Sequence, residues 1–250
     1  PIISMAAVGV LMAMLVLVAS VRGLSGPVTR FEGRRFVPYD ERSPRSALSS
    51  ELVDMLNAKK RTNMNWRGVP MLKSPFDACI LIELLRELHP ATVIELGALA
   101  GGSALFIADQ LKALSISPSH VYSIDNSVER LHPNALRAQL THNLSFVPAD
   151  ARDLGAILTD EFMAQLPHPI LVLEDAHVNV VGVLQWFDRH LHAGDYVIIE
   201  DTVDTQKANA VSHFLSLQPT GKYAVDAHLC DYFGPNACWC PNSFLRRMRD

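Results

Sequence analysis

Four acidic residues stand in two adjacent pairs, and each pair ends an apolar run of the chain. Glu174 and Asp175 close the run LVLED, and Glu200 and Asp201 close the run YVIIED. If these runs are neighbouring parallel strands, their carboxyl ends bring the four carboxylates to one edge of a sheet. Such a group is unstable unless protons or a divalent cation neutralise it. Because every ligand atom is oxygen, we expect Mg²⁺, Mn²⁺ or Ca²⁺. The alternative is that the acids only cap the loops after two strands.

A histidine follows the first acid pair. His177 lies two residues after Asp175. An imidazole titrates near neutral pH, so this side chain is suited to act as a general base or as a further metal ligand.

A glycine-rich segment, ELGALAGGS at residues 95–103, follows another apolar run and opens a helical pattern. Glycine lets the backbone turn tightly and approach a ligand, and the N-terminus of a helix offers free N–H groups to an anion. The spacing of Gly97, Gly101 and Gly102 does not match the dinucleotide motif G-x-G-x-x-G. It resembles the E-x-G-x-x-x-G loop of S-adenosylmethionine-dependent methyltransferases, which backs the methionine part of the cofactor. A turn kept only for packing is the alternative.

Two further acids follow the next two apolar runs. Asp125 ends the run HVYSID, a position from which a carboxylate can accept hydrogen bonds from both ribose hydroxyls of a nucleoside. Asp150 follows the run SFVPA, where methyltransferases of this kind often contact the adenine. Capping of a helix is the alternative function for both residues.

These residues need a scaffold in which short apolar strands alternate with amphipathic helices. This alternation indicates a doubly wound, mostly parallel, Rossmann-like α/β sheet. The expected strands are 91–96, 120–125, 145–149, 169–174 and 195–200, and the expected helices are 49–59, 76–88, 102–114, 128–140, 153–165 and 179–191.

The chain before this domain has a different composition. Residues 1–21 contain 17 apolar residues and no charge, which matches the ~20 residues of a transmembrane helix. A cleavable targeting segment and a buried helix are the alternatives. Residues 22–48 are rich in arginine and read as a linker, and residues 49–250 as the folded domain. The apolar segment predicts a single-pass membrane protein. The arginine excess after it predicts that the domain lies on the cytosolic, matrix or stromal side.

Composition excludes two classes of protein. The 250 residues are 49% hydrophobic and 19% charged, with a net charge of −4. This balance argues against a disordered chain, and it also argues against binding to nucleic acid through bulk charge. We therefore expect one folded core and no nucleic-acid partner.

The four cysteines do not form a disulfide framework. Cys79 stands alone, whereas Cys230, Cys238 and Cys240 are clustered near the end of the chain. A zinc site that includes His228, a single disulfide and free packed thiols all remain open, and the spacing fits no standard zinc finger.

Several segments together resemble the cephalosporin hydroxylase / rhamnosyl O-methyltransferase family. They are residues 66–77 (WRGVPMLKSPFD), 95–103, 174–177 (EDAH), 194–202 (GDYVIIEDT) and 241–247 (PNSFLRR). The resemblance covers about residues 49–247 and keeps the order and spacing of the segments.

The resemblance implies a class I methyltransferase fold that binds S-adenosylmethionine with a divalent metal, usually Mg²⁺, beside it. By motif position, the implied cofactor residues are Glu95, Gly97, Gly101, Ser103, Asp125 and Asp150. The implied metal ligands are Glu174, Glu200 and Asp201. Family members commonly have Asp at position 174, so the longer glutamate would either shift the metal or pass its role to Asp175. His177 and Asp175 are the expected catalytic residues.

The resulting hypothesis is an O-methyltransferase in which a metal lowers the pKa of an acceptor hydroxyl and His177 or a carboxylate takes its proton. The expected acceptor is a hydroxylated small molecule, a sugar or a lipid-linked compound. The alternative is a catalytically idle subunit anchored in a membrane assembly, and a homo-oligomer is also compatible with the sequence. A hydroxylase is disfavoured because no two-histidine, one-carboxylate iron site is apparent.

Overall fold

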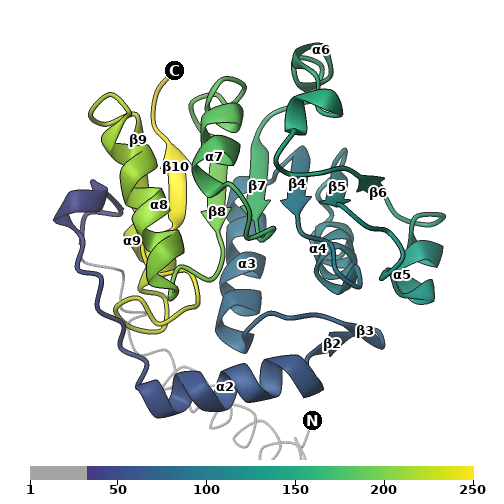
Figure 1. Cartoon of the computed structure of the whole chain (residues 1–250), viewed down its shortest axis with the longest axis horizontal. Helices are drawn as coiled ribbons and strands as arrows, with labels where there is room; N and C mark the ends of the chain where they lie inside the picture. The colour runs from purple at the N-terminus through teal and green to yellow at the C-terminus, as the bar shows by residue number, and fades with distance from the viewer. Residues whose placement is uncertain (1–32) are drawn as a thin grey trace, which may run out of the picture. The chain divides into compact units, whose positions relative to one another are not determined.

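The computed structural model describes residues 33–250, apart from the side chains of residues 59–63. Residues 34–250 form one compact unit around an eight-stranded sheet with the strand order β1-β9-β10-β8-β7-β4-β5-β6 (Figure 1). The strands of this sheet are β1 (Phe36–Val37), β4 (Thr92–Leu96), β5 (His120–Asp125), β6 (Leu144–Pro148), β7 (Ile170–Glu174), β8 (Tyr196–Ile199), β9 (Tyr223–Asp226) and β10 (Phe244–Arg247). Strands β2 (Asn65–Trp66) and β3 (Val69–Pro70) form a separate hairpin.

Helices cover both faces of the sheet (Figure 1). They are α2 (Ser50–Asn63), α3 (Pro75–Leu88), α4 (Gly102–Ala113), α5 (Pro133–Ala138), α6 (Asp160–Met163), α7 (Val180–Asp188), α8 (Thr205–Ser216) and α9 (Ala227–Cys230), with short 3-10 helices at Tyr39–Glu41 and Leu154–Ala156. Helix α3 contacts α4, and α7 contacts α8. The predicted mostly parallel, Rossmann-like sheet is therefore confirmed.

The topology places a switch point in the middle of the sheet. Strands β6, β5, β4, β7 and β8 run parallel, whereas β10 is antiparallel to both β8 and β9. The chain moves from β4 outward to β5 and β6 and then returns to β7 on the other side of β4. The connections after β4 and β7 therefore leave in opposite directions, and open α/β sheets bind ligands at this switch point.

The compact unit begins earlier than the sequence indicates. Part of the expected linker, residues 34–48, belongs to it: β1 pairs with β9, and Arg42 forms an ion pair with Asp231 at 2.6 Å. Arg35 likewise pairs with the buried Asp226 at 2.8 Å. Arg35 and Arg42, two of the arginines that suggested a basic flank, therefore have specific acidic partners in the fold.

The expected membrane location is contradicted. Among residues 33–250, no helix is long and apolar enough to cross a bilayer. The segment 1–21, on which that expectation rested, lies outside the described residues.

The cysteines are free thiols. Cys79 is exposed, and Cys230, Cys238 and Cys240 are buried. Burial raises the pKa of all three buried thiols and keeps them in the neutral form that packs well in an apolar core.

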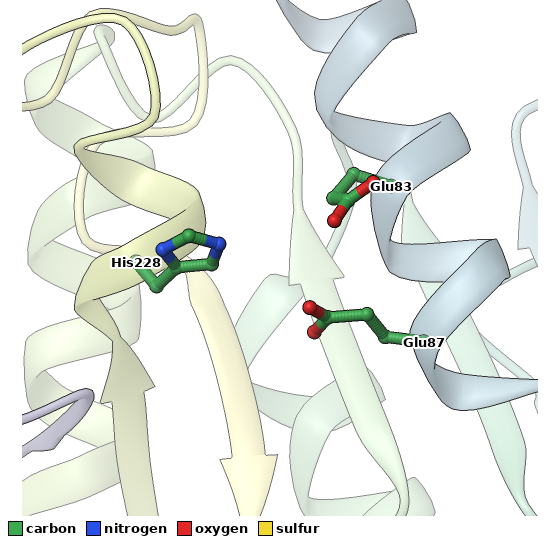
Figure 2. A group of neighbouring side chains, drawn as sticks. All are labelled: Glu83, Glu87 and His228. Atoms are coloured by element: carbon green, nitrogen blue, oxygen red, sulfur yellow. The ribbon is translucent and has the colours of Figure 1, made fainter. Parts of the chain in front are cut away.

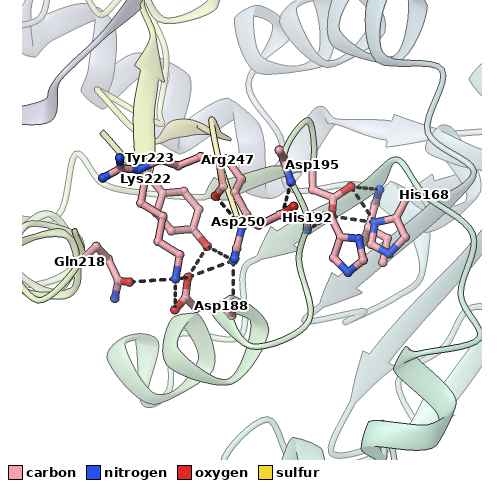
Figure 3. Close-up of polar contacts among 12 residues, drawn as sticks. His168, Asp188, His192, Asp195, Gln218, Lys222, Tyr223, Arg247 and Asp250 are labelled. Carbon is pink, nitrogen blue, oxygen red and sulfur yellow. Dashed lines mark hydrogen bonds and ion pairs between the residues drawn. The ribbon is translucent and has the colours of Figure 1, made fainter. Parts of the chain in front are cut away.

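A polar network joins α7 to the end of the sheet (Figure 3). The carboxylate of Asp188, the last residue of α7, accepts hydrogen bonds from Lys222 at 2.8 Å and Tyr223 at 2.9 Å. It also accepts one from Arg247 at 3.1 Å. One carboxylate therefore holds the start of β9 and the end of β10 beside α7.

We expect Asp188→Ala to destabilise the protein because it removes the nearer of the two carboxylates that pair with the mostly buried Arg247. The free energy of unfolding should fall by about 2–4 kcal/mol, measured by urea unfolding. Glu129→Ala, at an exposed acid, should change it by less than about 0.5 kcal/mol. Equal effects of the two substitutions would contradict this assignment.

Candidate functional site

The glycine-rich loop between β4 and α4 lies against the segment that follows β7. Gly97 has φ +101°, and a Cβ atom added there would lie 2.7 Å from the carbonyl oxygen of Asp175. Gly101 has φ +83° and precedes α4. A residue with a side chain would be strained at a positive φ, and at position 97 it would also clash with the Asp175 carbonyl. Glycine therefore lets the loop lie against the segment after β7.

A cavity of about 380 Å³ opens at the carboxyl ends of β4, β5, β6 and β7. Seven of the predicted site residues line it: Gly97, Ser103, Asp125, Asp150, Asp175, His177 and Asp201. The other four, Glu95, Gly101, Glu174 and Glu200, do not line it. The structure thus brings the glycine loop, Asp125 and the second acid of each pair to one cavity.

Asp125 connects two loops on the cavity wall. Its Oδ2 accepts a hydrogen bond from the backbone N–H of Leu99 at 2.9 Å, and its Oδ1 accepts one from Ser127 at 3.1 Å. The next helix begins only at Pro133. Asp125 therefore does not cap a helix, and its carboxylate is held at the cavity by backbone groups on both sides.

Asp150 occupies the outer edge of the same cavity. It forms an ion pair with Arg152 at 2.7 Å, and both side chains are exposed. Hydrogen bonds from the side chain and the backbone of Arg152 lower the pKa of Asp150 to about 2. The residue is therefore ionised at neutral pH.

Glu95 lies beneath the glycine loop rather than in the cavity. It is 1% exposed and accepts a hydrogen bond from Ser123 at 2.5 Å. Burial raises its pKa, against the opposing effects of Lys73 and of hydrogen bonds from Ser103 and Ser123. Its contacts make it a support for the loop.

The first acid of each pair points inward and faces a buried lysine. Glu174 is fully buried and lies 2.9 Å from the ammonium group of Lys207 in α8. Its other oxygen accepts backbone N–H groups of Ala176 and His177 at 3.1 and 3.2 Å. Glu200 forms a buried ion pair with Lys73.

These lysines change the charge argument made from the sequence. Burial raises the pKa of Glu200 to about 8, with Lys73 opposing that rise and Asp175 adding to it. Burial would lower the pKa of Lys73, but Glu200 and the neighbouring acids raise it overall. Two of the four carboxylates thus have an internal cation, which the sequence argument for a metal overlooked.

The second acid of each pair points to the cavity and contacts His177. Nε2 of His177 lies 3.1 Å from Asp175 and 3.5 Å from Asp201. One ligand atom from each of the three residues lies within 4.8 Å of the others. The hydrogen bond from His177 to Asp175 raises the pKa of the histidine, although burial opposes the rise. For Asp175, burial favours the neutral form, but His177 and the lysines outweigh it and lower the pKa.

Three residues of this site have a left-handed backbone. Leu99, His177 and Asp201 all have positive φ, at +47°, +58° and +57°. None is a glycine or an asparagine, and such conformations cost about 1–3 kcal/mol each. Strained residues of this kind are typical of functional sites, and these three follow β4, β7 and β8.

Sequence reasoning missed Lys73 and Lys207. Lys73 falls inside the recognised segment 66–77, but nothing in that segment indicates its partner, 127 positions away. Lys207 lies in a polar stretch of α8 that the sequence did not predict as a helix. Only the three-dimensional contact with a buried acid identifies either residue.

Known proteins resemble this chain in sequence. A family model described as rhamnosyl O-methyltransferase/CmcI matches residues 58–248. A rhamnosyl O-methyltransferase of Mycobacterium leprae is 33% identical over 139 residues, which cover 55% of this chain and 59% of that protein. One from Mycobacterium bovis is 31% identical over 144 residues, or 56% of this chain and 58% of that protein. The chain therefore matches less than two thirds of the length of these relatives.

Solved structures extend the similarity over more of the chain. A structure of CmcI with Mg and SAM is 27% identical, with a TM-score of 0.62 over 89% of this chain and 90% of that one. An O-methyltransferase from Bacillus cereus in complex with SAH is 17% identical, with a TM-score of 0.50 over 69% of this chain and 79% of that one. The second likeness concerns the fold alone.

We expect Lys73→Met to destabilise the metal-free protein more at pH 9.5 than at pH 6. The pKa of Glu200 is raised to about 8 in the folded protein, so Lys73 faces an ionised carboxylate only above that pH, where losing Lys73 makes Glu200 take up a proton. Urea unfolding should show an additional loss of about 2 kcal/mol at pH 9.5.

The double variant Lys73→Met with Glu200→Gln should recover most of that loss at pH 9.5, because neither charge remains. Equal losses at both pH values, without recovery in the double variant, would show that Lys73 contributes only through packing.

Proposed function

Because the chain belongs to the rhamnosyl O-methyltransferase/CmcI family, we propose that it is an S-adenosylmethionine-dependent O-methyltransferase. The proposed acceptor is a hydroxyl group of a sugar or of another small hydroxylated molecule, as the names of the curated relatives suggest. The observation that carries this proposal is one cavity that joins a glycine-rich strand-helix loop, the acid of the neighbouring strand and a histidine between two carboxylates.

The cavity is the proposed site of the methyl donor. Gly97 lines it with bare backbone, and its close packing on the Asp175 carbonyl holds the loop against the segment after β7. Asp125 would hold the ribose hydroxyls, because each oxygen accepts a single hydrogen bond here and has a lone pair left. Gly97 and Ser103 would hold the methionine part and Asp150 the adenine side, whereas Glu95 and Gly101 would support the loop.

His177 is the proposed base. The bound cofactor supplies an electrophilic methyl group on a sulfonium sulfur, so the acceptor oxygen must lose a proton as its new bond to carbon forms. Nε2 of His177 donates its N–H to Asp175 at 3.1 Å, so the other ring nitrogen, Nδ1, takes that proton and Asp175 stabilises the imidazolium. The products are the methyl ether and S-adenosylhomocysteine. The chain contributes chiefly by holding donor and acceptor in line and excluding water.

A divalent cation fits the outer acids. Asp175 and Asp201 present oxygen atoms close to each other at the cavity, whereas Glu174 and Glu200 already face lysines. We therefore assign the proposed metal to Asp175 and Asp201, in place of the expected set of Glu174, Glu200 and Asp201. When bound, the cation would supply Lewis acidity that lowers the pKa of an acceptor hydroxyl. Oxygen donors favour Mg²⁺ or Mn²⁺.

We expect Asp125→Asn to weaken binding of S-adenosylhomocysteine by about tenfold or more, because the charged acceptor for the ribose is lost. Isothermal titration calorimetry measures this change, and the melting temperature reports on folding. Asp153→Ala, at an exposed acid outside the cavity, is the matched control and should bind as the wild type does. Failure of the wild type to bind the compound would favour the idle-subunit alternative.

We expect Asp201→Asn to weaken Mn²⁺ binding by about tenfold or more, measured by electron paramagnetic resonance, while binding of S-adenosylhomocysteine persists. Glu200→Gln should retain Mn²⁺ binding, since Glu200 faces Lys73. If Glu200→Gln loses the ion as Asp201→Asn does, Glu200 returns to the ligand set.

A further inference from the structure

One wall of the cavity is built by the segment that leaves the β2-β3 hairpin. Pro70, Met71, Leu72 and Lys73 all line the cavity. The hairpin turn itself has positive φ at Arg67 (+51°) and Gly68 (+78°), the conformation of a tight two-residue hairpin turn. A two-stranded hairpin of this length has little stability of its own, so its position depends on what it packs against.

The hairpin packs directly on α4. A Cβ atom added at Gly102, the first residue of α4, would overlap the carbonyl oxygen of Pro70. One turn further along, the ring of Trp66 meets Phe106 edge to face, with 5.0 Å between ring centroids. Any shift of the hairpin along α4 would therefore break the close contact at Gly102 and move the cavity wall.

A single carboxylate anchors this arrangement. Asp109, on α4, accepts hydrogen bonds from the indole N–H of Trp66 at 2.7 Å and from Arg67 at 3.1 Å. The ring of His142, in the loop before β6, lies 2.8 Å from the Asp109 oxygen that Arg67 also contacts. Burial would raise the pKa of Asp109, but these three partners outweigh it and lower the pKa.

We propose that Asp109 is a positioning residue for the cofactor site. It fixes the β2-β3 hairpin on α4 and thereby sets the position of Pro70–Lys73 at the cavity; this inference rests on the proposed function. Asp109 lies seven residues after Gly102, about 10 Å along the helix, and it does not line the cavity. Its effect on a ligand there must therefore pass through the hairpin.

A second group of possible metal ligands, between α3 and α9, is already bound by arginines. Glu83 and Glu87 of α3 face His228 of α9 (Figure 2), with ligand atoms within 4.8 Å of one another. Arg86 already binds Glu83, and Arg35 binds Glu87. A cation would have to displace both arginines.

The test compares Asp109→Asn with Trp66→Phe, which keeps an aromatic ring but removes the indole N–H. Each should raise the dissociation constant of S-adenosylhomocysteine about five- to twentyfold in isothermal titration calorimetry. The double variant should lose little more than Asp109→Asn alone, because Trp66→Phe removes one of the bonds that Asp109→Asn already weakens. A residue that acts only on global stability would instead lower the melting temperature and leave this affinity unchanged.

Asp160→Asn is the matched control, because Asp160 also contacts a histidine, His190 at 3.2 Å, but lies outside the cavity. It should bind S-adenosylhomocysteine as the wild type does. Affinities within twofold of the wild type for both Asp109→Asn and Trp66→Phe would overturn the proposal.

Hydrogen exchange of residues 64–73 in the ligand-free protein separates this inference from the proposed function. Asp109→Asn should speed exchange there by at least about fivefold relative to Asp160→Asn. If the wild type does not bind S-adenosylhomocysteine, the proposed function fails, and exchange alone then decides whether Asp109 holds the hairpin. Unchanged exchange would overturn that role.

Discussion

The site is organised by two buried ion pairs, Glu174 with Lys207 and Glu200 with Lys73. A buried carboxylate requires a partner, because an uncompensated charge in the interior costs several kcal/mol. Each lysine comes from a segment outside the two strands, so each pair ties a strand end to a neighbouring element. The lysines neutralise the inner acids, Glu174 and Glu200, whereas the outer acids, Asp175 and Asp201, face the cavity.

This division explains why paired acids follow both strands. Successive residues of a strand point to opposite sides, and the chain turns away at the strand end, so one acid enters the core and the next reaches the cavity. The positive φ of Asp201 and His177 shows that the turn is strained. The inner pairs provide the rigid base against which such strain can persist. In each pair, the first acid therefore stabilises the fold and the second faces the cavity.

The sequence predicts the central sheet well and its surroundings poorly. The runs that became β4, β5, β7 and β8 are short and apolar, because a parallel sheet is buried on both faces. Helix α5 is shorter than expected: it begins at Pro133, which fits the first turn of a helix but not its interior. Strands β9 and β10 were missed because they contain polar residues, such as Asp226 and Arg247, whose partners lie far away in the chain.

The segment 66–77 shows where sequence reasoning reaches its limit. Trp66 binds Asp109, Lys73 binds Glu200, and Asp77 accepts the backbone N–H of Trp239 at 3.0 Å. Each contact joins residues more than 40 positions apart, so neither local propensity nor periodicity can report it. A family resemblance can identify such a segment as a whole, but only the fold shows which partner each of its residues contacts. The segment thus contacts α4, the end of β8 and the C-terminal region. These contacts hold both of its ends, and the residues between them, from Pro70 to Lys73, form the cavity wall.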